Sequence, residues 1–264
     1  MMTKSTPPLI ELRNISVARN GRTVLHNLNL RIEAGEHVAI MGPNGSGKST
    51  LIKTITREFY PLREEGSSMT LFGHETWDNS KLRSMMGIMT SDIAGFYERY
   101  VTGGDAVLSG FFGSVGLARH HKVKPGMRKK TAELLEMLEI SHLDDRVINE
   151  MSSGEVRRVM IARALVHEPK ALLFDEPSNS LDVHAQTELR HTMSKLAQSG
   201  IALLLITHNL PDVVPEIERV IFMRDGRIVG DGGKPELLTA ERLGSLFGCP
   251  VQVTKHDGYF HQIS

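Results

Sequence analysis

The sequence contains almost no cysteine and no long apolar run. Cys249 is the only cysteine in 264 residues, which excludes an internal disulfide framework and suits a reducing compartment. No stretch approaches the roughly 18 apolar residues that a membrane-spanning helix needs. The first eight residues are polar and lack the apolar segment of a signal peptide. These features predict a cytoplasmic protein that reaches a membrane only through a partner.

An excess of charge of either sign is also missing. The chain carries 31 Lys and Arg against 31 Asp and Glu, so its formal net charge is zero at pH 7. The overall charge therefore gives no support for binding nucleic acid or anionic lipid, and no nucleic-acid partner is expected. Hydrophobic residues make up 40% of the chain, enough to build a full core. The length fits one α/β domain with an inserted subdomain.

Several short apolar runs end in polar residues, which predicts a sheet with a functional edge. Ligands bind at the carboxyl ends of the strands in open α/β sheets. The runs that we interpret as buried parallel strands are residues 38–41, 87–89, 171–174 and 201–206. Their polar ends are therefore expected to gather at one edge of the sheet.

Turn signals and helical spacing predict the remaining elements. Asn20-Gly21 and Asp225-Gly226 each lie between apolar segments and predict β-hairpins. Apolar residues at helical spacing in 131–138 and 155–166 predict a helical insertion over about 92–165. Residues 235–247 are expected to form a helical tail.

A glycine-rich stretch directly after the strand at 38–41 matches the pattern G-x-x-x-x-G-K-[ST]. In this pattern the glycines let successive backbone N–H groups face a phosphate, and the following helix presents its positive end to it. Lys48 is expected to neutralise the β- and γ-phosphates, and the Ser49 hydroxyl to bind Mg²⁺. The predicted ATP-binding stretch is Gly42, Pro43, Asn44, Gly45, Ser46, Gly47, Lys48, Ser49 and Thr50.

Two adjacent carboxylates close the apolar run at 171–174. Asp175 is placed to hold the metal, and Glu176 to orient or deprotonate an attacking water, since adjacent side chains on a strand diverge. The alternative is a solvated strand end. The phosphate-binding loop earlier in the chain favours the catalytic interpretation.

The stretch Met151-Ser152-Ser153-Gly154-Glu155 resembles the signature motif of ATP-binding cassette (ABC) ATPases, which is usually Leu-Ser-Gly-Gly-Gln. Residues 178–182 resemble the D-loop of that family, and His208 its switch histidine. The order of the motifs agrees with the family, and the resemblance covers roughly residues 9–232. It implies a P-loop NTPase core sheet with an N-terminal antiparallel β subdomain and an inserted helical subdomain.

The resemblance also implies a single ABC ATPase domain over 1–264, with core segments 1–91 and 166–264 and the helical subdomain 92–165. Two such chains would form a homodimer on binding ATP and Mg²⁺ and would couple hydrolysis to a transmembrane permease. Catalysis would fall to Lys48, Glu176 and His208, with Ser49 and Asp175 at the metal. The residues expected to act across the dimer are Ser152, Ser153, Gly154 and Asp182.

The sequence departs from the family pattern at two points. The family usually carries an aromatic residue near position 19 that stacks on adenine, whereas this chain has Arg19, whose planar guanidinium is a candidate substitute. The family's glutamine before the helical insertion aligns with Ser91, which is too short to reach far without a water. Asp92 is then a second candidate for the metal.

Three functions are compatible with these motifs. The first is the ATPase of an importer, since residues 105–110 and 233–251 look similar to ATPases of metal-chelate and molybdate importers. The others are a cassette ATPase without a permease and a nucleotide-dependent switch that hydrolyses poorly. The glycine-rich segment 102–116 fits either a buried helix or a surface for a membrane partner. Residues 254–257 resemble a guanine-reading element, which we attribute to coincidence.

Overall fold

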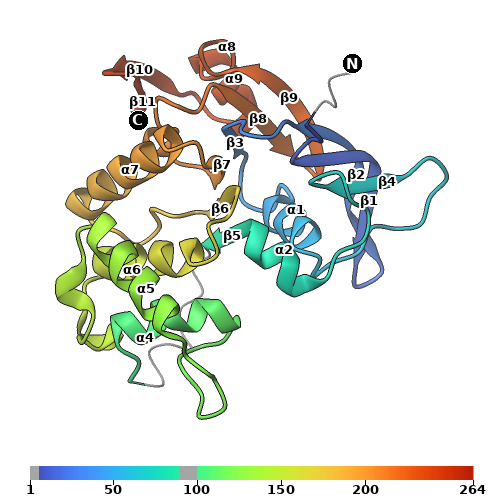
Figure 1. Ribbon diagram of the computed structural model, residues 1–264. Helices are drawn as coiled ribbons and strands as arrows, with labels where there is room; N and C mark the ends of the chain where they lie inside the picture. The colour runs from blue at the N-terminus through green and yellow to red at the C-terminus, as the bar shows by residue number, and fades with distance from the viewer. Residues whose placement is uncertain (1–5, 90–99, 264) are drawn as a thin grey trace, which may run out of the picture. The chain divides into compact units, whose positions relative to one another are not determined.

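The computed structural model describes residues 6–89 and 100–263, which form two compact units (Figure 1). The first unit comprises Met1–Asn79 and Ala202–Ser264, and the second comprises Ser80–Ile201. Strands dominate the first unit and helices the second. The second unit is wider than the predicted insertion at 92–165, because it also contains two strands and the helix that follows them.

An antiparallel sheet opens the first unit. Strands β1 (Ile10–Arg19) and β2 (Arg22–Ile32) form a hairpin in which Arg19 is paired with Arg22. Asn20 and Gly21 turn the chain with φ angles of 49° and 75°, the left-handed backbone that this two-residue turn requires. The predicted hairpin is therefore confirmed. Strand β4 (Ser68–Leu71), which pairs with the other side of β1, was not predicted from the sequence.

A second group of strands in the first unit carries the phosphate-binding loop. Strand β3 (Val38–Met41) lies parallel to both β7 (Ala202–Thr207) and β8 (Arg219–Arg224). The predicted turn at Asp225-Gly226 joins β8 to the antiparallel β9 (Arg227–Gly233). The order is β7-β3-β8-β9, and β3 and β7 are buried throughout. Helix α1 (Lys48–Ile55) follows the loop after β3.

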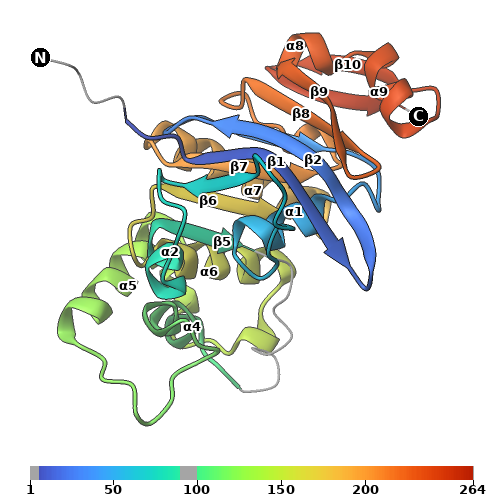
Figure 2. The same cartoon turned by 90° about the vertical axis from the view of Figure 1, so that its right-hand side faces the viewer.

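The end of the chain differs from the prediction of one helix over 235–247. Two short helices, α8 (Lys234–Leu237) and α9 (Ala240–Phe247), take its place. The break occurs at Thr239, whose extended backbone and hydroxyl cap α9 by accepting a bond from the N–H of Arg242 at 3.3 Å. Beyond them, β10 (Gln252–His256) and β11 (Tyr259–Ile263) form a hairpin (Figure 2). The guanine-like stretch thus lies in an ordinary hairpin.

The second unit packs helices around a pair of strands. Strand β5 (Met86–Met89) lies parallel to β6 (Ala171–Asp175). The predicted helices are confirmed, although both begin at different residues from those expected. The helices are α2 (Asn79–Met85), α4 (Gly103–Ser109), α5 (Pro125–Met137), α6 (Ser153–Leu165) and α7 (Val183–Gln198). Single-turn 3₁₀ helices at Gly110–Phe112, Ser141–Leu143, Ile148–Glu150 and Leu210–Asp212 complete the two units.

The segment 102–116 contains a buried helix, α4, followed by a half-exposed end. Val107 and Leu108 on α4 are almost fully buried, and Phe112 stacks on His121 with the ring centroids 4.2 Å apart. Helix α4 is therefore buried, whereas Gly110–Phe112 at its end contains no buried residue, so a surface for a membrane partner at that end stays a prediction. No helix among the described residues is long and apolar enough to cross a bilayer.

Candidate functional site

The loop between β3 and α1 has the close-packed backbone that a phosphate cradle needs. Gly45 and Gly47 adopt left-handed conformations with φ of 80° and 103°, and Gly47 caps α1. Gly42 is packed so tightly that an added Cβ would lie 2.1 Å from the carbonyl oxygen of Met223. The loop conformation therefore depends on these glycines, as the sequence pattern predicted.

Two polar groups inside the loop fit an anionic ligand. The ammonium of Lys48 is buried and donates to the carbonyls of Gly42 at 2.7 Å and Pro43 at 3.1 Å, which holds its charge at the centre of the loop. The Ser46 hydroxyl is buried and has no hydrogen-bond partner within residues 6–89 and 100–263. A buried hydroxyl without a partner is costly, and an oxygen of a bound phosphate would satisfy it.

Gly226, in the turn between β8 and β9, joins the loop to the β1–β2 hairpin. Its N–H donates to the carbonyl of Ser46 at 2.9 Å, and its own carbonyl accepts from the N–H of His26 at 2.9 Å. An added Cβ would lie 1.9 Å from the carbonyl oxygen of Val24. Gly226 was predicted only as a turn residue, and its part in positioning the loop was not predicted.

Arg19 lies at the end of β1, beside a pocket lined by Arg19, Asn20, Arg22 and Val24. Its guanidinium carbon stands 4.7 Å from the ring centroid of Phe59, and Lys53 approaches the same ring at 5.5 Å. Phe59 lies 40 residues from Arg19 in the sequence and was not predicted to take part. The contact places the guanidinium of Arg19 over the Phe59 ring, at a distance typical of a cation–π interaction.

His208 is exposed and directly follows β7. Met41, which precedes the phosphate-binding loop, is paired with Thr207 across the parallel strands. The loop and His208 therefore leave the sheet at the same edge, as predicted for polar groups at strand ends.

In the second unit, the predicted metal ligand Asp175 and the predicted catalytic Glu176 lie at the end of β6. Asp175 is the last residue of the strand, and both it and Glu176 are half-buried. Glu176 has a φ of 47°, a left-handed conformation that is uncommon for a residue with a side chain and that clusters at functional positions. Asp175 and Ser49 offer oxygen atoms, the donors that Mg²⁺ prefers.

The signature-like stretch forms the N-terminus of α6. Ser152 and Glu155 form a capping box, in which the Ser152 hydroxyl accepts from the Glu155 N–H at 3.3 Å and the Glu155 carboxylate accepts from the Ser152 N–H at 2.7 Å. Burial alone raises the pKa of Glu155, but the bonds to Ser152 and the nearby Arg146 lower it overall. The Glu155 carboxylate is thus bonded to the N-terminus of its own helix.

The residues expected to act across a dimer differ in exposure. Ser152 and Ser153 are exposed, whereas Gly154 is buried against α7, where an added Cβ would lie 2.8 Å from that of Ala185. Asp182 is exposed and caps α7, accepting from the Ala185 N–H at 2.8 Å. Gly154 therefore has a packing role within the chain, which the motif alone did not predict.

Arg157 on α6 is a further residue that the sequence analysis missed. Its buried guanidinium contacts the Met89 sulfur at 3.9 Å, at the end of β5, and the Asn179 carbonyl at 3.4 Å, in the D-loop-like stretch. One side chain thus touches the strand that precedes Ser91 and the segment that follows Glu176. Ser91 and Asp92 themselves lie outside the described residues.

The model of the family described as "ABC transporter" matches residues 25–179. The chain is 30% identical to the ABC transporter ATP-binding protein YlmA of Bacillus subtilis, over 93% of each chain. It is also 30% identical to the hemin import ATP-binding protein HmuV of Plesiomonas shigelloides, over 93% of this chain and 97% of that one.

Solved structures of ATP-binding cassettes resemble the chain as well. The ADP conformation of MJ1267 aligns with a TM-score of 0.75 at 26% identity, over 88% of this chain and 93% of that one. The dimeric post-hydrolysis state of MJ0796, bound to ADP and Pi, aligns with a TM-score of 0.69 at 27% identity, over 85% and 98%. These matches confirm the predicted α/β P-loop ATPase fold with its antiparallel subdomain. The chain belongs to the ABC transporter family and is an ATP-binding, ATP-hydrolysing subunit of such a transporter.

Proposed function

We propose that this chain powers an importer, working with separate membrane-spanning permease subunits at the inner face of the cell membrane. The observation that carries this proposal is the similarity to HmuV, a hemin import protein, along nearly the full length of both chains. The described residues contain no helix that could cross a bilayer, so the passage for the cargo would come from other subunits.

We further propose that two copies close on two ATP molecules. The exposed Ser152 and Ser153 on one copy would meet the phosphates held by the other, and the exposed Asp182 would join the two sites. The relative MJ0796 has been seen as a dimer, which supports this arrangement. Gly154 would act mainly by letting α6 approach α7, so that the N-terminus of α6 stays in place.

Within each copy, the residues of the loop would bind and orient the triphosphate. Lys48 would shift from the carbonyls of Gly42 and Pro43 to phosphate oxygens, and backbone N–H groups of the loop would surround them. Glu176 would hold the attacking water and accept its proton, and His208 would steady the γ-phosphate. Ser49 and Asp175 would hold Mg²⁺, which neutralises phosphate charge when it is bound.

Arg19 would bind the adenine by stacking. The guanidinium lies over the Phe59 ring, and the base would stack on the side of the guanidinium away from that ring. Changing Arg19 to alanine should weaken ATP binding, and Phe59→Leu should weaken it less. Unchanged affinity in Arg19→Ala would contradict this role.

The test of the proposed cycle uses Glu176→Gln. This variant should bind ATP, accumulate as a dimer in size-exclusion chromatography and hydrolyse little, because the water lacks its base. Lys48→Ala is the matched control, since it should fail to bind ATP and stay monomeric. Ordinary turnover in Glu176→Gln would remove Glu176 from catalysis. Purification of the chain with a membrane protein from its own cells would test the permease, and its absence there would favour a cassette ATPase without one.

A further inference from the structure

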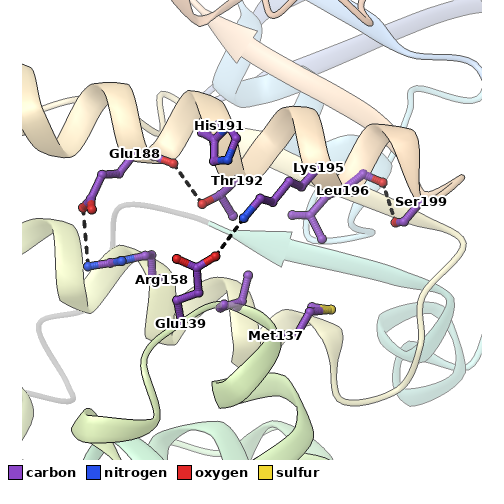
Figure 3. A pocket seen from close by; sticks show the side chains of 10 residues that line it. Met137, Glu139, Arg158, Glu188, His191, Thr192, Lys195, Leu196 and Ser199 are labelled. Carbon is purple, nitrogen blue, oxygen red and sulfur yellow. Dashed lines mark hydrogen bonds and ion pairs between the residues drawn. The ribbon is translucent and has the colours of Figure 1, made fainter.

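A pocket that the proposed cycle does not use lies among the end of α5, α6 and α7 (Figure 3). Its volume is about 250 Å³, and the 10 residues that line it all belong to the second unit. None of them is a predicted ATP-site residue. Pockets for drug-sized ligands measure roughly 300–1,000 Å³, so this one suits a smaller molecule.

The pocket has an apolar floor. Leu138 and Leu196 are 8% and 3% exposed, and Met137 adds a half-exposed thioether at the rim. Such a floor favours an occupant with an apolar body, because burying that body removes apolar surface from water.

The acidic groups of the pocket already contact cations. Lys195 on α7 donates to the Glu139 carboxylate at 2.8 Å, and Arg158 on α6 lies 3.4 Å from the Glu188 carboxylate. Figure 3 shows Arg158 and Glu139 directed toward α7 from the opposite side of the pocket. A cationic occupant would therefore have to compete with both pairs.

Arg158, which lines the pocket, has one donor without a hydrogen-bond partner in the described part of the chain. The Nε of Arg158 is buried and has no hydrogen-bond partner among the residues that the structure describes. A buried N–H of a charged guanidinium gains most from a charged acceptor, and a carboxylate matches the planar donors of arginine. His191, which also lines the pocket, adds a second donor.

We propose that this pocket binds a small carboxylate with an apolar body, whose charged end accepts from Arg158 and whose body covers Leu138 and Leu196.

The pocket lies where α6 and α7 pack together, and these two helices carry the predicted dimer contacts. Gly154 touches Ala185 where α6 and α7 begin to pack, and the contact of Arg158 with Glu188 lies one turn further along both helices. An occupant would change the spacing of α6 and α7 and thereby alter ATP turnover. This consequence rests on the proposed function, whereas the binding itself does not.

The first experiment compares two probes of the same shape on the full chain by titration calorimetry. 3-Phenylpropionate carries the carboxylate, and 3-phenylpropan-1-ol replaces it with a neutral hydroxyl. The acid should bind at least about tenfold more tightly, the difference expected for a charged over a neutral hydrogen bond. Equal affinities, or no binding of the acid, would overturn the proposal.

Three variants assign that binding to the pocket. Arg158→Lys keeps the charge beside Glu188 but lacks Nε, and it should bind the acid about tenfold more weakly. Ser199→Trp places an indole at the pocket rim and should abolish binding, whereas Gln198→Trp, on the neighbouring residue outside the lining, should not. Thermal unfolding checks that all three are folded. Undiminished binding in both Arg158→Lys and Ser199→Trp would show that the acid binds elsewhere and would refute the site.

ATP turnover provides the second measurement. Saturating 3-phenylpropionate should change the turnover of the unaltered chain and of Gln198→Trp, and should leave Ser199→Trp unaffected. Binding at the pocket without any change in turnover would contradict the coupling. A chain that lacks turnover even without the probe would instead contradict the proposed function, so the two failures are distinguishable.

Discussion

Replacing Gly226 with alanine tests whether the turn after β8 holds the phosphate-binding loop in place. Gly226 has a φ of 71°, and a left-handed backbone costs a residue with a side chain about 1–2 kcal/mol. The added Cβ would also lie 1.9 Å from the Val24 oxygen and must retreat by about 1.5 Å to reach ordinary contact near 3.4 Å. Overpacking of this kind adds about 1–3 kcal/mol.

The matched control is Gly35→Ala. Gly35 has a similar φ of 82°, but an added Cβ there meets nothing within 4 Å, so only the backbone cost of about 1–2 kcal/mol applies. In urea unfolding followed by circular dichroism, Gly226→Ala should therefore lose more free energy of unfolding than Gly35→Ala, by about 1–3 kcal/mol.

Nucleotide affinity separates a local clash from a displaced loop. Because the Gly226 N–H bonds to the Ser46 carbonyl, moving the turn should move the loop. Titration with ATP should then show weaker binding in Gly226→Ala and unchanged binding in Gly35→Ala. Equal losses of stability together with equal ATP affinities would refute the reasoning.

Three further predictions concern the start of α6. Ser152→Ala should lower the free energy of unfolding by about 1 kcal/mol through loss of the cap, whereas Ser153→Ala should change it little; urea denaturation of both variants checks this. The pKa of Glu155 is lower in the folded chain than the ordinary carboxyl value of 4.5, so the ionised carboxylate stabilises the fold at pH values above 4.5. This stabilisation is lost as the pH falls through the pKa that Glu155 has in the folded chain. The chain should thus lose more stability over that fall in pH than Glu155→Gln, measured by thermal unfolding across pH. Gly154→Ala should be destabilising, because its Cβ would lie 2.8 Å from that of Ala185. Ala185→Gly removes the second Cβ and should offset part of that loss of stability in the double variant. If the stability changes of the two single variants simply add in the double variant, α6 and α7 adjust freely to the added Cβ.

The elements that the sequence predicted correctly are those whose local chemistry allows few alternatives. Asn20-Gly21 and Asp225-Gly226 tolerate the left-handed backbone of a two-residue turn, so both hairpins followed from the residues alone. The phosphate-binding loop was equally predictable, because its glycines have no substitute where Gly42 meets Met223.

The features that were missed depend on partners distant in sequence. Strand β4 is four residues long, and its place is set by the free edge of β1. The support of Arg19 by Phe59 and the contacts of Arg157 come from tertiary packing that no local pattern contains. The last hairpin carries the turn signal Asp257-Gly258, but its strands are largely exposed and lack a strong apolar alternation.

The position of Arg157 has a consequence for genetics. Since one guanidinium contacts both Met89 and the segment at Asn179, a mutation on either side alters the surroundings of the same cation. Suppressors of a defect near Asn179 should therefore arise at Arg157, or at Met89, which is 90 residues away in the sequence, and homologues should exchange these residues as a set.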